Sequence, residues 1–153
     1  IITDKVRRLV KRTGFPGMKV FQFAFDGKPE NEHLPENIKY NTLYYTGTHD
    51  NDTLKGWYDA LNDGAKAYVK DKLGATDANV FDKVFKKVMH SRAKYVIVPM
   101  QDYLLQDTTA RMNTPGTNDG NWKYVLPKNY QKAKNRIKKY VKSRCVDSRG
   151  GNK

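Results

Sequence analysis

The sequence predicts an α/β protein with parallel strands, and three observations support this prediction. Apolar segments of strand length alternate with segments whose apolar residues recur at helical spacing. Each apolar segment ends in a polar stretch, and the last of them, 95–100, is a continuous apolar run typical of a buried parallel strand. Such alternation favours parallel pairing with right-handed crossovers. Because a closed barrel needs about eight strands, the three found here predict a piece of a larger sheet.

The first two expected elements are a helix and a strand. Val6, Leu9 and Val10 have helical spacing after a Thr3-Asp4 cap, and Gly14 ends the helix. Residues 19–25 then read as a strand that is covered on both faces, because both sets of alternating residues are largely apolar. One set is Phe21, Phe23 and Phe25, and the other is Val20, Gln22 and Ala24.

A polar loop, 26–39, leads to the second strand at about 42–46. The next helix is capped by Asp52 or Thr53 and stopped by Asp63-Gly64. Its apolar residues are Leu54, Trp57, Tyr58 and Leu61, which places Trp57 in the core. A further helix with Tyr68, Val69 and Leu73 ends at Gly74.

Another helix opens at Thr76 or Asp77, with a broad apolar stripe from Val80 to Met89. The third strand follows, with Pro99 at its end, where no ladder donor is required. A long polar loop, 106–122, precedes the last helix at about 128–144, and residues 146–153 are expected to fray. The apolar face expected for this helix comprises Tyr130, Ala133, Ile137, Tyr140 and Val141.

The net charge is +13, from 29 basic and 16 acidic residues. This raises nucleic acid, an anionic membrane or an acidic protein as partners. The excess lies largely near the C-terminus, since no acidic residue occurs between Asp119 and Asp147. The tyrosines of the last helix fall on its apolar face, which favours packing against the domain over base stacking. A basic module for an anionic polymer such as nucleic acid stays as the alternative function.

The compartment is inferred from the single cysteine, Cys145, which allows no disulfide within the chain and favours a reducing, cytoplasmic setting. No apolar run approaches the roughly 20 residues that span a bilayer. The N-terminus lacks the order of a signal peptide and a starting Met. We therefore expect a cytoplasmic chain that is part of a longer one.

Residues 49–52, His-Asp-Asn-Asp, follow the second strand and are the first candidate site. Asp50 can accept hydrogen bonds from vicinal hydroxyls and His49 can donate one, which suits a sugar ring. The competing interpretation is a helix cap with an Asx-turn and an exposed His49. For Asp52 the cap is the favoured role.

A metal site has little support in the pattern. An EF-hand loop would require Asp or Asn at 54 and Gly at 55, where this chain has Leu54 and Lys55. No His or Cys pair has zinc spacing. His33 and His90 are isolated and are expected at the surface or at helix ends, and no cofactor is expected.

The second candidate site is the segment 111–117, RMNTPGT. Arg111 and Asn113 can bind carboxylate or hydroxyl groups, while Pro115-Gly116 fixes a turn. The alternative is an ordinary connecting loop. Trp122, farther along, is a candidate for stacking on a sugar face.

Three blocks together resemble the C-terminal part of 4-α-glucanotransferase, also called amylomaltase or disproportionating enzyme. They are 14–25 (GFPGMKVFQFAF), 45–53 (YTGTHDNDT), and 99–102 (PMQD) continued by 110–117 (ARMNTPGT) and 120–122 (GNW). The resemblance spans about 1–145. It implies that the three strands are the sixth to eighth of a (β/α)8 TIM barrel, incomplete on its own.

The resemblance also implies a function: transfer of α-1,4-glucan segments between maltooligosaccharides by a retaining double displacement. Asp50 matches the carboxylate that stabilises the transition state, and His49 the histidine that binds the same sugar. Asn113 and Pro115 match positions near the acceptor, and Phe23 and Phe25 lie on the strand leading to the glucan groove. The nucleophilic Asp and the acid/base Glu are expected upstream of Ile1, so the isolated chain is expected to be inactive.

The partners that follow are an α-1,4-glucan or maltooligosaccharide, with no membrane and with nucleic acid unlikely. Open sheet edges also raise self-association.

Overall fold

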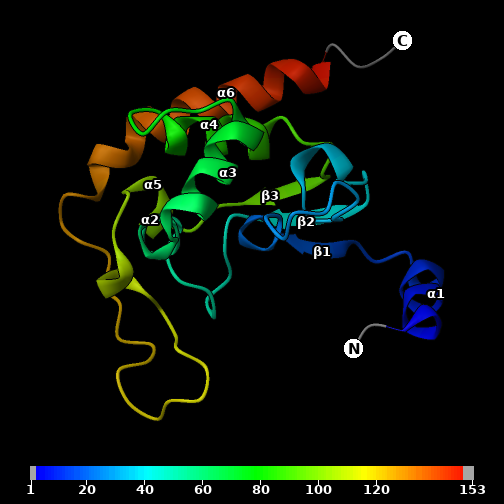
Figure 1. Cartoon of the computed structure of the whole chain (residues 1–153), viewed down its shortest axis with the longest axis horizontal. Coiled ribbons are helices and arrows are strands. Elements are labelled where there is room, and N and C mark those ends of the chain that lie inside the picture. The colour runs from blue at the N-terminus through cyan, green and yellow to red at the C-terminus, as the bar shows by residue number, and fades with distance from the viewer. Residues whose placement is uncertain (1–2, 150–153) are drawn as a thin grey trace.

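The structure, a computed structural model, describes the backbone of residues 3–149 and the side chains of residues 3–144. Three parallel strands form one sheet in the order β1 (Gly17–Val20), β2 (Thr42–Tyr45) and β3 (Tyr95–Ile97). Met18, Leu43 and Tyr95 lie in register across it. The sheet is not closed, as expected for a piece of a larger one (Figure 1).

The first strand is shorter than predicted. β1 ends at Val20, and residues Phe21–Phe23 form a 3-10 turn, η1, in which Ala24 N–H donates to Phe21 O at 2.9 Å. Phe21 is fully buried, Phe23 is 53% exposed, and Phe25 packs edge-on against Phe21. The predicted alternation of three phenylalanines on one face is therefore wrong. Burial of Phe21 in the core prevails over the strand propensity of the sequence.

Among the described residues, helices cover one face of the sheet, while the other face is largely exposed. Tyr44 lies fully buried beneath the helices, and its hydroxyl donates to His33 O at 2.6 Å. On the other face Met18, Tyr95 and Ile97 are 59%, 48% and 40% exposed. The expectation that β1 and β3 are buried on both sides is therefore wrong. An apolar strand sequence predicts burial but does not say which segment covers the strand.

Helix α1 (Asp4–Thr13) has the predicted ends: the Thr3 hydroxyl accepts from Val6 N–H, and Gly14 adopts φ 69°. The helix lies apart from the sheet (Figure 1). Its apolar residues Val6 and Leu9 are exposed. Arg7 donates to Glu32 at 2.9 Å, which ties the helix to the loop before β2.

The helices between β2 and β3 are α2 (Leu54–Ala60), α3 (Asp63–Leu73) and α4 (Val80–Met89). Asn62 caps α3 by accepting from Ala65 N–H at 2.9 Å, so Asp63-Gly64 begins this helix and the predicted stop is wrong. Gly74 ends α3 with φ 59°, as predicted. α4 begins at Val80 and not at Thr76 or Asp77, because those residues form a turn in which the Asn79 side chain accepts from Thr76 N–H.

The remaining elements are the short helices η2 (Pro35–Asn37), α5 (Met100–Tyr103), η3 (Thr108–Ala110) and η4 (Tyr130–Ala133), and the long α6 (Lys134–Arg149). α6 runs beyond the end expected near 144. Residues 150–153 and the side chain of Cys145 lie outside the described part of the chain.

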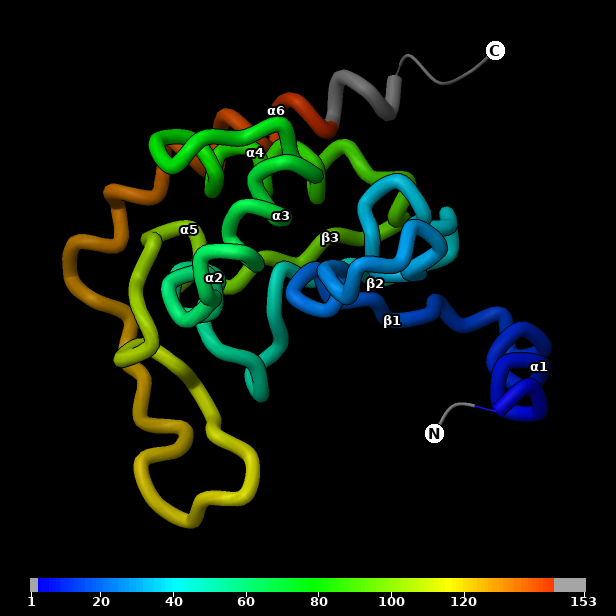
Figure 2. The backbone as a smooth tube through the Cα atoms, in the orientation of Figure 1, coloured from blue at the N-terminus to red at the C-terminus, as the bar shows by residue number. Residues whose placement is uncertain are grey.

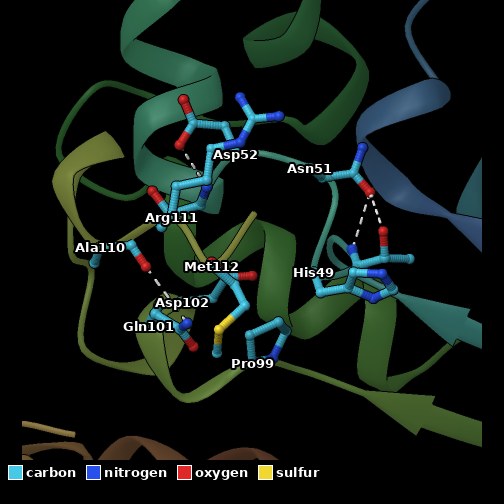
Figure 3. Close-up of a pocket in the computed structure, with 11 residues that line it drawn as sticks. His49, Asn51, Asp52, Pro99, Gln101, Asp102, Ala110, Arg111 and Met112 are labelled. Carbon is cyan, nitrogen blue, oxygen red and sulfur yellow. Dashed lines mark hydrogen bonds between the residues drawn. The ribbon is translucent and has the colours of Figure 1, made fainter. Parts of the chain in front are cut away.

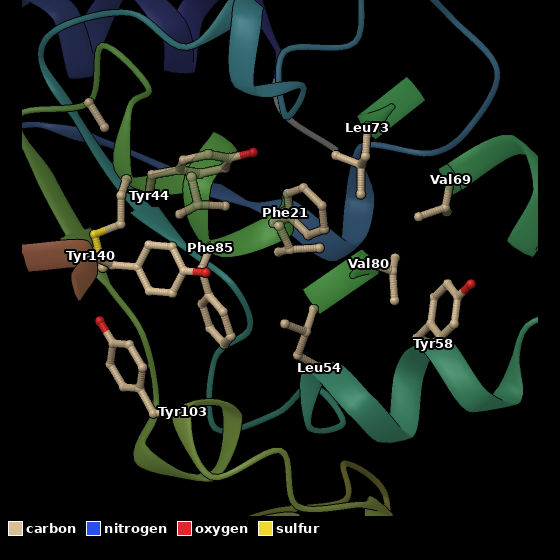
Figure 4. Close-up of a cluster of buried hydrophobic side chains, with 14 of the residues drawn as sticks. Phe21, Tyr44, Leu54, Tyr58, Val69, Leu73, Val80, Phe85, Tyr103 and Tyr140 are labelled. Carbon is tan, nitrogen blue, oxygen red and sulfur yellow. The ribbon is translucent and has the colours of Figure 1, made fainter. Parts of the chain in front are cut away.

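The main core lies between the covered face of the sheet and the helices (Figure 4). α6 joins it through Tyr140, whose ring lies 5.4 Å from that of Phe85 and whose hydroxyl donates to Asp82 O. Ala133 and Ile137 also face this core, whereas Tyr130 and Val141 stay exposed. The expectation that the apolar face of the last helix packs against the domain is thus met by its inner residues. No helix among residues 3–149 is both long and apolar enough to cross a bilayer.

Candidate functional site

The candidate site lies at the edge where the strands end. The loop 46–53 follows β2, and α5 follows β3 at the same edge, because both strands run in the same direction. In α/β proteins this edge is where binding and catalytic groups gather. The loop that begins at 106 runs beside it (Figure 2).

His49 and Asp50 lie together at the tip of the 46–53 loop. His49 Nε2 is 3.3 Å from Asp50 Oδ1, and the two side chains are 55% and 49% exposed. Asn113 Nδ2 donates to the same Asp50 oxygen at 2.6 Å. Three of the predicted site residues therefore form one solvent-facing group, although 63 positions separate Asp50 from Asn113 in the sequence.

Backbone contacts fasten the long loop to this tip. Asn113 N–H donates to His49 O at 3.1 Å, and the Arg111 guanidinium donates to Asp50 O at 2.7 Å. Arg111 Nε also donates to Asn113 O at 2.8 Å. The guanidinium therefore holds backbone of both loops, a structural role that differs from the direct ligand contact considered from the sequence.

Trp122 extends the group on the side of His49. The two ring centroids are 5.1 Å apart with planes tilted by 35°. Trp122 N–H donates to Met112 O at 2.8 Å, its φ is 60°, and the residue is 62% exposed. The indole thus stands open to solvent beside the imidazole.

The helix after the loop is capped by Thr53 and not by Asp52. Thr53 Oγ1 accepts from Gly56 N–H at 3.0 Å. Asp52 accepts from the Thr53 N–H and from the Thr108 hydroxyl, which links the loop to η3. A Cβ at Gly56 would lie 2.6 Å from Asp52 Oδ1, so the glycine makes room for this carboxylate. The favoured cap role of Asp52 is therefore wrong.

A cavity of about 150 Å³ lies behind the tip, between segments 48–53 and 110–112 (Figure 3). Its floor includes Asp102, a residue given no role from the sequence, which is 1% exposed. Asp102 accepts from Thr46 Oγ1 at 2.6 Å and from Leu54 N–H at 2.7 Å. Burial raises the pKa of this carboxyl to about 6, and the Asp52 charge acts in the same direction. The one sequence signal for it was its place in the block 99–102, which follows the third strand.

Other predicted site residues lie elsewhere. Phe25 packs in the core against Trp57, and Phe23 has its ring edge-on to His33, so neither lines the cavity beside His49. Pro115 is exposed at the far end of the loop, in a turn where Thr117 N–H donates to Thr114 O and Gly116 has φ 82°. Their contacts with a ligand stay predictions.

The histidines outside the site differ in environment. His90 is exposed at the C-terminus of α4, as predicted. His33 is only partly exposed, and its Nδ1 accepts from Val20 N–H at 2.9 Å within the fold. Burial lowers the pKa of this imidazole. Within the described residues, no three His, Cys, Asp or Glu side chains converge as metal ligands would.

The chain resembles known proteins of one family. The family model described as 4-alpha-glucanotransferase matches residues 1–130. A chloroplastic/amyloplastic 4-alpha-glucanotransferase of Arabidopsis thaliana is 44% identical over 83% of this chain and 22% of its own length. The 4-alpha-glucanotransferase of Aquifex aeolicus is 40% identical over 92% of this chain and 29% of its own.

A solved structure gives the same result at the level of the fold. The amylomaltase of Streptococcus agalactiae, in complex with acarbose, superposes with a TM-score of 0.88 and 31% identity. The match covers 94% of this chain and 30% of that one. The chain therefore spans less than a third of the length of these relatives.

Proposed function

The chain belongs to the 4-α-glucanotransferase family, and we propose that it supplies part of the sugar site of an enzyme that transfers α-1,4-glucan segments. It carries a portion of the catalytic domain of that family. The acceptors and donors would be maltooligosaccharides or longer glucans, and the reaction a retaining double displacement. The observation that carries the proposal is the solvent-facing pair of His49 and Asp50, fixed by Asn113 at the end of β2.

Asp50 is the residue to which we assign stabilisation of the transition state. In a retaining transfer the anomeric carbon gains positive charge as the glycosidic bond breaks, and a nearby carboxylate lowers the free energy of that state. A carboxylate oxygen can accept two hydrogen bonds. Asp50 therefore retains capacity for sugar hydroxyls while Asn113 holds it in place.

His49 is assigned to binding the same sugar ring. Its imidazole is half exposed beside the carboxylate, so a ring nitrogen can reach a hydroxyl that also contacts Asp50. Asn113 and Pro115 border the side from which an acceptor would approach. For Phe23 and Phe25 we propose only a contact with a longer glucan and no contact with the ring at His49, because Phe25 is packed against Trp57.

Bond cleavage requires two more carboxyl groups, a nucleophile and an acid/base, about 5 Å apart in retaining enzymes. We assign these to the part of the relatives' length that this chain does not span. The isolated chain is therefore expected to leave maltotriose unchanged. Chromatography after prolonged incubation checks this, and longer or shorter oligosaccharides in the mixture would contradict it.

Sugar binding can be tested without catalysis. Titration of the 153-residue chain with acarbose, followed by NMR, is expected to shift the amide signals of His49, Asp50 and Asn113. Asp50→Asn is expected to weaken this binding about tenfold, because hydrogen bonds to a charged group contribute about 1.5–3 kcal/mol. Asp71→Asn removes an exposed carboxylate from α3 and serves as the matched control. Equal affinity of the two variants would refute the role of Asp50.

A further inference from the structure

Asp102 occupies an unusual position in the site: it bonds both ends of the loop that carries His49 and Asp50. Its Oδ2 accepts from the Thr46 hydroxyl at 2.6 Å, where the loop leaves β2. Its Oδ1 accepts from Leu54 N–H at 2.7 Å, where the loop enters α2. Thr46, Leu54 and Asp102 are all almost completely buried.

We propose that Asp102 is a positioning residue, whose carboxylate closes the base of the 46–54 loop and thereby sets where His49 and Asp50 stand. The effect on sugar binding rests on the proposed function, because the placement of His49 and Asp50 matters only if the two side chains contact a sugar. The claim that Asp102 holds the loop in place rests on the hydrogen bonds alone.

The other contacts of the loop show why the base matters. Arg111 and Asn113 hold the tip through backbone oxygens of Asp50 and His49. Gln22 donates to Asp52 O at 2.8 Å on the side of β1. These groups bind the outer part of the loop, whereas Asp102 joins its two stems to each other and to the segment after β3.

The chemistry of Asp102 suits this role. A carboxylate can accept from two donors on separate oxygens, and such charge-assisted bonds are stronger than neutral ones. Keeping a buried carboxylate costs free energy, consistent with its raised pKa. The charged or titratable groups around it are Asp52, and Arg111 and His49 in the same cavity. The two short bonds offset part of that cost.

Three variants separate positioning from simple packing. Asp102→Leu keeps the approximate size of the side chain and removes both acceptors. Thr46→Val removes the hydroxyl at nearly constant volume, and Thr46→Ser keeps it. If the carboxylate acts by bonding both stems, the first two changes loosen the loop and the serine variant does not.

Amide hydrogen exchange measures how firmly the loop is held in the absence of sugar. The Asn113 N–H, which donates to His49 O, is expected to exchange about tenfold faster in Asp102→Leu and Thr46→Val than in the unmodified chain. The Phe85 N–H in α4 serves as an internal control for global opening. Thr46→Ser and the exposed-site variant Asp119→Asn are expected to match the unmodified chain.

The affinity for acarbose tests the effect on sugar binding. It is expected to fall at least fivefold in the Asp102→Leu and Thr46→Val variants and to match the unmodified chain in Thr46→Ser. Unchanged Asn113 exchange in Asp102→Leu and Thr46→Val would overturn the proposal, as would loss of protection at Phe85 to the same extent. If the unmodified chain does not bind acarbose but the exchange pattern appears, the proposed function fails while the positioning role stands.

Discussion

At the scale of single residues, the site depends on polar side chains that come from distant parts of the sequence. The sequence pointed to His49, Asp50 and Asn113 as candidates, because each stands in a polar stretch after an apolar strand or in a polar loop, and the fold brings the three together. It assigned no role to Asp102 in the block 99–102, because an acidic residue shortly after a strand gives no sign that it is buried. Only the fold brings Asp102 between Thr46 and Leu54.

The raised pKa of Asp102 has a consequence for stability. Its folded pKa of about 6 lies above the ordinary value of 3.8 for an exposed Asp, so between these values the folded state holds a proton that the unfolded state releases. The contribution of this group to the free energy of unfolding therefore falls as pH rises from about 4 to 6. At about 1.36 kcal/mol per pKa unit, the free energy of unfolding falls by at most about 3 kcal/mol across this pH range.

The measurement is urea unfolding of the unmodified chain and of Asp102→Asn at pH 4.5 and pH 7.5. The difference in stability between the two proteins is expected to shift in favour of Asp102→Asn at the higher pH. A difference that is independent of pH would show that Asp102 does not titrate in this window.

At the scale of elements, the helix ends marked by glycine were predictable, whereas the boundaries expected at Asp52, Asp63-Gly64 and Thr76 were wrong. Gly14 and Gly74 end α1 and α3 where the sequence placed them, because positive φ is a local requirement that glycine meets. The end of β1 was not predictable, because the turn at Phe21 depends on the core that receives its ring. Local backbone requirements therefore set these two helix ends, while packing in the core set the end of β1.

Two leucines on helices are expected to differ sharply in their contribution to stability. Leu73→Ala in α3 removes a side chain that is 5% exposed in the core and is expected to cost about 2–5 kcal/mol. Leu9→Ala in α1 changes a residue that is 60% exposed and is expected to stay within about 0.5 kcal/mol. Urea midpoints of both variants check this. Similar losses would mean that Leu9 is covered in solution.

At the scale of the whole molecule, the sheet has one covered face and one open face. The sequence predicted a piece of a larger sheet from the number of strands, and the fold agrees. It could not predict which face stays open, because that depends on polypeptide outside the three strands. Exposed apolar residues on this face, among them Met18, Tyr95 and Ile97, make association the expected behaviour of the chain in solution.

Light scattering at increasing concentration is expected to show this association. Ile97→Lys places a charge on the open face and is expected to reduce the mean mass toward that of the monomer. Val125→Lys changes a residue that is 82% exposed outside the sheet and is the control with the same substituent. A strictly monomeric unmodified chain would contradict the prediction.

The bonds between the two site loops have a further consequence for how the protein acquires its shape. They join residues 61 and 63 positions apart, whereas the caps of α1, α2 and α3 join residues only three apart. Closing a long stretch of chain costs entropy before such distant bonds can form. We expect the locally capped helices to form early during folding and the cluster of His49, Asp50 and Asn113 to be completed late, together with the pairing of β2 and β3, which joins residues 52 positions apart. This makes the cluster one of the first features to be lost when the chain is only partly folded.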